Sequence, residues 1–168
     1  MPSFGIASLL ADAAACRPAD LALEHEGVRT TYAAAAAAAA RLAAELRERG
    51  VERGAVVAWI GDNTPACWLA YLGSAWGGVV LAPLHLRLTD DDLRRVLAHA
   101  EARLILCEPA SAGRARALGL PIVELSGGSF ETAASWRVRR PAPPEAGPDD
   151  PAHLYYTSGS TGVPKGVI

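Results

Sequence analysis

Short apolar runs alternate with helix-forming segments along the middle of the chain, and this alternation restricts the fold more than any other feature. Residues 55–60 form a continuous apolar run, as in a strand covered on both faces. Further strands are expected at 79–82, 103–107 and 121–125, with helices at 65–76, 89–100 and 110–118 between them. Strands that alternate with helices predict an α/β fold: a mostly parallel sheet with flanking helices and right-handed crossovers.

The boundaries of these helices carry recognisable start signals. Thr64 can cap a helix that has Pro65 in its first position, and Thr89 can cap the next one. Asp90, Asp91 and Asp92 then occupy the first helical turn, where the helix dipole favours carboxylates, so we interpret them as a helix start and not as a metal site. Earlier in the chain, the sequence predicts a short helix near 7–15, a hairpin of strands at 21–25 and 28–31, and a long alanine-rich helix over 32–49.

Charge and cysteine usage exclude several classes of protein. With 16 Lys and Arg against 18 Asp and Glu, the net charge of −2 gives no electrostatic case for nucleic acid or an anionic membrane. The three cysteines are far apart and the four histidines lack ligand spacing, so we predict no metal site and reduced thiols in a cytoplasmic protein. Residues 66–84 carry no charge, but Gly73, Gly77, Gly78 and Pro83 interrupt them, which favours a buried helix and strand over a membrane span.

The last quarter of the chain changes character. Residues 126–151 are rich in Gly, Pro and Arg, and we interpret them as a surface connection. We expect a last strand at 153–157 that leads into a glycine-rich loop. The expected organisation is therefore an alternating subdomain at 1–125, the connection at 126–151, and the final strand with its loop at 152–168.

This loop combines three hydroxyls, three glycines and the single lysine of the chain. Glycine lets a backbone turn sharply and approach a ligand, and successive N–H groups in such turns form anion sites. Hydroxyls add donors, and Lys165 adds a mobile positive charge, so the composition suits a polyphosphate. The Walker pattern does not fit, because Pro164 precedes the lysine where that pattern needs glycine. Because ligands of parallel sheets bind at the carboxyl ends of strands, the loop is placed where a ligand is expected.

As a whole string, residues 156–166 resemble the signature of the adenylate-forming (AMP-binding) superfamily, which includes acyl-CoA synthetases and peptide-synthetase adenylation domains. That signature reads Thr-Ser-Gly-(Ser/Thr)-Thr-Gly-x-Pro-Lys-Gly, and every fixed position is met here. Further similar stretches are Thr31-Tyr32 before the long helix, 62–65 after the first buried strand, and 77–84 around the second. The resemblance extends over about residues 20–168 and implies the N-terminal domain of such an enzyme, in incomplete form.

The resemblance implies a reaction and a set of site residues. A carboxylate attacks the α-phosphate of MgATP, which gives an acyl-adenylate and pyrophosphate, and a thiol such as coenzyme A then takes the acyl group. Lys165 and Thr161 are the catalytic candidates. The ATP-phosphate contacts implied by position are Thr157, Ser158, Gly159, Ser160, Thr161, Gly162, Val163, Pro164 and Lys165. ATP, Mg²⁺ and coenzyme A are the implied cofactors, and a small carboxylic acid is the implied substrate.

Residues 85–89 favour an acyl- or aryl-CoA ligase over an amino-acid-adenylating domain. Their sequence, His-Leu-Arg-Leu-Thr, is similar to the Asn-x-Arg-Leu stretch of acyl-CoA ligases, with His85 at the asparagine position. Two alternatives stay open: an adenylation domain of a peptide synthetase, and a non-catalytic truncated or split nucleotide-binding module. Family members continue for several hundred residues, so we expect the chain alone to be inactive and to need a C-terminal portion. That portion and a second copy of the chain are its candidate protein partners.

Overall fold

The computed structural model describes residues 5–126, 144, 146, 149–157 and 165–167. Along this part of the chain, the central feature is a parallel four-stranded sheet in the order β4-β3-β5-β6. Its strands are β3 (Val56–Ile60), β4 (Val80–Leu84), β5 (Leu104–Cys107) and β6 (Ile122–Glu124). The predicted α/β class and the mostly parallel sheet with flanking helices are therefore confirmed.

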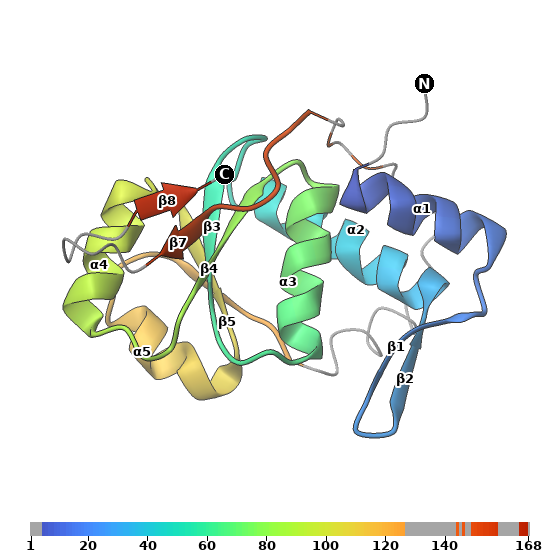
Figure 1. The fold of residues 1–168 in the computed structure, drawn as a ribbon, viewed down its shortest axis with the longest axis horizontal. Helices are drawn as coiled ribbons and strands as arrows, with labels where there is room; N and C mark the ends of the chain where they lie inside the picture. Colours follow the sequence, from blue (N-terminus) through green and yellow to red (C-terminus); the bar gives the residue numbers. More distant parts are fainter. Residues whose placement is uncertain (1–4, 127–143, 145, 147–148, 158–164, 168) are drawn as a thin grey trace.

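Helices cover both faces of this sheet (Figure 1). On one face lie α2 (Tyr32–Glu48) and α3 (Pro65–Trp76), and α1 (Ile6–Cys16) packs against these two helices. On the other face lie α4 (Asp90–His99) and α5 (Ala112–Arg116), preceded by a 3₁₀ turn at Pro109–Ser111. Strand residues alternate between the two sides, since Val57 and Trp59 join the first cluster whereas Ala58 and Ile60 join the second. All four of these side chains are almost fully buried, as expected of parallel strands covered twice.

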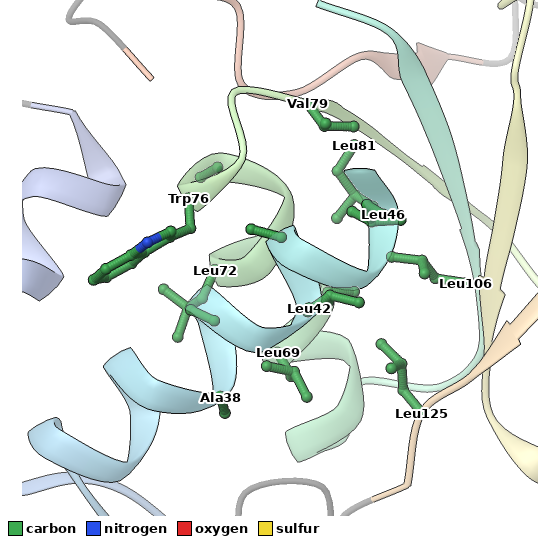
Figure 2. Close-up of a cluster of buried hydrophobic side chains, with 14 of the residues drawn as sticks. Ala38, Leu42, Leu46, Leu69, Leu72, Trp76, Val79, Leu81, Leu106 and Leu125 are labelled. Atoms are coloured by element: carbon green, nitrogen blue, oxygen red, sulfur yellow. The ribbon is translucent and has the colours of Figure 1, made fainter. Parts of the chain in front are cut away.

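The first core is formed where α2 and α3 pack against the sheet (Figure 2). Leu42 and Leu46 of α2 point into the same space as Leu81 and Leu106 of the strands. Gly73 lets the two helices approach closely, because a Cβ built at this position would lie 2.5 Å from Leu42 Cδ2. The buried alanines of α2 have the same effect, so the alanine run serves helix packing as well as helix propensity.

Several element boundaries differ from the sequence expectation. The strand expected at 79–82 continues to Leu84 through Pro83, which pairs with Trp59 of β3. Proline lacks a ladder donor and is tolerated in strands at a sheet edge, and β4 is the outer strand of the four. The hairpin of β1 (Leu21–His25) and β2 (Val28–Thr31) lies where the sequence predicts it.

The chain reaches the sheet again near its end. Ala152 and Leu154 exchange backbone hydrogen bonds with Leu81 of β4, which makes His153 a parallel bridge partner of Leu81. Strand β7 (Tyr155–Thr157) follows, and it pairs antiparallel with β8 (Lys165–Val167), a strand that the sequence pattern does not predict. Most of the expected surface connection at 126–151 lies outside the described residues.

Candidate functional site

The topology indicates that the candidate site lies at the carboxyl ends of the parallel strands. The strand order reverses direction between β3 and β5, and ligands of open α/β sheets bind beyond the carboxyl ends of the strands near such a reversal. Three segments meet at this end: the turn after β3, residues 85–88 after β4, and β7. A cavity of about 580 Å³ lies between them. Its lining includes Asp62 and Asn63 of the turn, His85 and Leu86 after β4, and Thr157 of β7.

Glu108 fixes the turn after β3. Its carboxylate accepts a hydrogen bond from the backbone N–H of Asp62, at 2.8 Å, and another from the Thr64 hydroxyl. Thr64 is the N-cap residue of α3 as predicted, but its hydroxyl donates to Glu108 and makes no hydrogen bond to the helix backbone. Gly61 allows this close approach, since a Cβ there would lie 2.9 Å from Glu108 Oε2. Glu108, which follows β5, thus ties the turn after β3 to the end of the neighbouring strand.

Arg114 holds the segment after β4. Its guanidinium donates to the carbonyl oxygens of Leu86 and Leu88, and it forms an ion pair with Asp90 at 2.7 Å. These contacts tie residues 86–90 to α5. The apolar side chains of Leu86 and Leu88 line the cavity, so one arginine on the neighbouring helix sets this part of the wall.

The cavity wall contains a buried thiol and a buried indole. Burial, together with the nearby Glu108 carboxylate, raises the pKa of Cys67 to about 11. This thiol is therefore protonated near neutral pH and is a poor nucleophile. Trp59 Nε1 is buried and makes no hydrogen bond with any described residue. Within the part of the chain that the structure describes, the cysteines are free and no cluster of three potential metal ligands occurs.

The hairpin of β7 and β8 brings two of the predicted ATP contacts together. Thr157, the last residue of β7, is the register partner of Lys165, the first residue of β8. The two residues that flank the predicted loop are therefore opposite each other in this hairpin (Figure 1), and Thr157 lines the cavity at the carboxyl ends of β3 and β4. Ser158, Gly159, Ser160, Thr161, Gly162, Val163 and Pro164 lie outside the described residues, so their assignment to ATP stays a prediction.

Side chains that the sequence analysis did not assign to the site surround β7. They are Tyr71 of α3, His99 of α4 and His153 of the bridge, whose contacts with Tyr155 and Tyr156 are described below. A polar residue directly after a buried strand, such as Glu108 after β5, is a weak signal that could have been noticed. The aromatic residues around β7 carry no such signal, because they are spread over 86 positions from Tyr71 to Tyr156.

The comparisons with known proteins decide the family. The model of the AMP-binding enzyme family matches residues 10–168. The chain belongs to this family. That membership confirms the resemblance to adenylate-forming enzymes that the loop sequence indicates.

Relatives in the family fall into more than one class. Feruloyl-CoA synthase of Amycolatopsis is 34% identical over 171 residues, which are 100% of this chain and 34% of that protein. Surfactin synthase subunit 2 of Bacillus subtilis is 34% identical over 151 residues, which are 90% of this chain and 4% of that protein. The chain thus spans about a third or less of these relatives.

Solved structures of the family share the fold. The crystal structure of VinN matches with a TM-score of 0.83 and 29% identity, over 99% of this chain and 46% of that one. A Mycobacterium tuberculosis fatty acyl CoA synthetase matches with a TM-score of 0.80 and 26% identity, over 97% of this chain and 34% of that one. No helix among the described residues of this family member has the length and apolarity to cross a membrane.

A prediction for stability follows from the half-buried imidazole of His153 next to β7. Its Nε2 is buried without a hydrogen bond to the described residues, and burial lowers the pKa of this histidine in the folded protein. The unfolded chain therefore takes up the proton first as the pH falls below about 6.5. The neutral imidazole contributes stability above that pH, and the contribution is lost as the pH falls through the lowered pKa.

We expect the free energy of unfolding to fall as the pH decreases from about 6.5, the ordinary histidine pKa, to the lowered pKa of the folded protein. Urea unfolding at a series of pH values measures it. His153→Gln should make the decline shallower, because glutamine does not titrate. An equally steep decline in His153→Gln would show that another group causes the pH dependence.

Proposed function

We propose that the chain is the ATP-phosphate-binding part of a ligase that activates a carboxylic acid and transfers the acyl group to coenzyme A. The observation that carries this proposal is the β7–β8 hairpin, which pairs Thr157, a residue of the cavity wall, with Lys165 in a member of the AMP-binding family. Because the chain spans only about a third of feruloyl-CoA synthase, the activity is proposed for the complete protein that contains this chain.

The proposed reaction has two steps. A carboxylate oxygen of the acid attacks the α-phosphorus of MgATP, the bond to the bridging oxygen breaks, and pyrophosphate leaves with that oxygen. In the second step the sulfur of coenzyme A attacks the acyl carbonyl, the thiol proton is released, and AMP leaves as the thioester forms. The magnesium ion enters with its nucleotide, as part of the substrate.

The roles proposed for this chain concern the leaving pyrophosphate. The ammonium group of Lys165 would neutralise charge on the β- and γ-phosphates, and the hydroxyls of Thr157, Ser158, Ser160 and Thr161 would donate hydrogen bonds to them. Gly159 and Gly162 would let the backbone approach, with Val163 and Pro164 completing the loop. Donors that hold the leaving group in line assist the transition state by position and charge.

Coenzyme A as the acceptor is supported by residues 85–89, which are similar to the corresponding stretch of acyl-CoA ligases. The alternative is an amino-acid-adenylating domain that loads a carrier-protein thiol. The similarity to surfactin synthase subunit 2 supports this second candidate, because its 34% identity to the chain equals that of feruloyl-CoA synthase.

The acceptor is tested by incubating the complete protein with ATP, magnesium and a panel of fatty, aryl and amino acids. One set of reactions receives coenzyme A, and a matched set receives a phosphopantetheinylated carrier protein. We expect mass spectrometry to detect an acyl-CoA thioester from a fatty or aryl acid. Acyl-carrier-protein formation from an amino acid, without acyl-CoA, would contradict the proposal and support the second candidate.

A further inference from the structure

Strand β7 is attached to the rest of the molecule by side chains on both of its faces. Successive residues of a strand point to opposite sides, so Tyr155 and Tyr156 face different layers. The backbone bridge to β4 is made just before the strand, at His153, and no further bridge to β4 follows it among the residues that the structure describes. The placement of β7 therefore depends strongly on its two tyrosines.

Tyr155 contacts α3. Its hydroxyl lies 3.3 Å from the hydroxyl of Tyr71, within hydrogen-bond distance. The ring of His153 lies edge-on to the ring of Tyr71, with 4.8 Å between centroids, and 5.9 Å from the ring of Tyr155. Burial and the hydrogen bond to Tyr155 both raise the pKa of Tyr71, so its phenol keeps its proton and can donate.

Tyr156 contacts α4 on the other side. Its hydroxyl forms a hydrogen bond of 2.9 Å with Nδ1 of His99, the last residue of that helix. The two rings pack edge to face, with 5.7 Å between centroids. Burial raises the pKa of Tyr156, so this phenol is also protonated at neutral pH.

The two contacts also fix β8. Tyr156 pairs with Gly166, and Thr157 pairs with Lys165, in the antiparallel ladder of the hairpin. A Cβ at Gly166 would lie 3.0 Å from Leu154 and 3.5 Å from the Tyr156 ring, so the backbone of β8 lies close against these side chains. A shift of β7 relative to α3 and α4 would therefore displace Thr157 and Lys165 together.

We propose that Tyr71 and His99 are positioning residues for nucleotide binding: by holding Tyr155 and Tyr156, they fix the hairpin that places Thr157 and Lys165. The inference rests on the proposed function, since it assigns these two residues to the phosphates of ATP. In this proposal Tyr71 and His99 act through β7, because their hydrogen-bond partners are Tyr155 and Tyr156. The helices on the two faces of the sheet thus both control the geometry of one phosphate site.

The test removes the hydroxyls and keeps the rings. Tyr71→Phe removes the hydroxyl that contacts Tyr155, and Tyr156→Phe removes the hydroxyl that contacts His99. Tyr32→Phe is the matched control, because Tyr32 lies on α2 and its ring packs against Arg17. In the complete protein, we expect the ATP concentration for half-maximal pyrophosphate exchange to rise about 2- to 10-fold in each variant, as for loss of one hydrogen bond. The KM for the acid and the behaviour of Tyr32→Phe should stay unchanged.

A second readout needs no enzymatic activity. Amide hydrogen exchange of residues 155–157 and 165–167 should become faster in the double variant Tyr71→Phe/Tyr156→Phe and stay as in the wild type in Tyr32→Phe. Unchanged amide exchange in the hairpin of the double variant would overturn the positioning role. So would equal rises in KM for ATP and for the acid, which would indicate a general structural effect. A wild-type protein without pyrophosphate exchange would instead contradict the proposed function, while amide exchange would still decide whether the hydroxyls fix the hairpin.

Discussion

Lys165→Ala in the complete protein is expected to slow adenylate formation about 10- to 100-fold, the effect of losing one charge-assisted hydrogen bond to a charged leaving group. The physical reason is that the negative charge on pyrophosphate grows as its bond to the α-phosphorus breaks. An ammonium group beside the β- and γ-phosphates is worth more at that point than in the ground state. Lys165 is opposite Thr157 in the pair of residues nearest the loop. This position makes Lys165 the candidate for the contact with the phosphates.

Single-turnover formation of the acyl-adenylate measures this effect, and the dissociation constant of the acid is measured separately. The rate should fall much more than acid binding weakens. Lys165→Arg is the matched variant, since it keeps the charge and should recover part of the lost rate. Equal losses in rate and in acid affinity, with no recovery by arginine, would show that Lys165 has only a structural role.

Leu46→Ala is expected to lower the free energy of unfolding by about 2–5 kcal/mol, the range for large-to-small changes in a packed core. The Leu46 side chain is 0% exposed and lies between α2 and the strands (Figure 2). Alanine leaves a space that the sheet residues around it cannot fill without moving. Since leucine and alanine have similar helix propensities, the loss in free energy of unfolding measures packing in the core and not the stability of the helix itself.

Urea unfolding compares this variant with Leu9→Ala, the same substitution on the surface of α1. The Leu9 side chain is 54% exposed, so we expect a loss below about 1 kcal/mol there, as for most surface substitutions. A loss in Leu46→Ala no greater than in Leu9→Ala would mean that α2 does not pack on the sheet as described. That outcome would also remove the support that this face gives to α3.

The sequence predicts the central layers well because each signal is local and strong. Continuous apolar runs such as 55–60 and 104–107 indicate doubly covered strands, and glycine, proline and threonine mark where the helices between them start and stop. Thr89 behaves as expected, because its side chain accepts a hydrogen bond from the N–H of Asp92 at 3.1 Å. The long helix at 32–49 and the hairpin before it follow from equally local patterns, and both are confirmed.

The features that the sequence does not predict depend on contacts between distant segments. Strand β8 has only three residues and includes a lysine and a glycine, so its sequence carries no strand pattern, and it forms because β7 offers a partner. Thr64 has the residue type of a helix cap, but its hydroxyl donates its hydrogen bond to Glu108, 44 residues away. The partners of Tyr155 and Tyr156 come from two different helices for the same reason, and no local pattern could have paired them.

The glycine-rich loop at 158–164, in contrast, is identified by the sequence and not by the structure. The sequence identifies the loop through its string of residues, and the described structure shows only where the loop begins and ends. Thr157 and Lys165 are placed as a pair, whereas the roles of residues 158–164 remain proposals from the resemblance. The sequence is thus more informative about the chemistry of the loop, and the structure is more informative about how its two ends are supported.

The central claim is that the complete protein forms an acyl-adenylate from ATP and a carboxylic acid. Exchange of labelled pyrophosphate into ATP tests this step most directly, because it requires the adenylate and no thiol acceptor. We predict exchange that depends on both magnesium and an added acid, and that is much slower in Lys165→Ala. Exchange absent with every fatty, aryl and amino acid supplied, in a folded protein that binds ATP, would contradict the account.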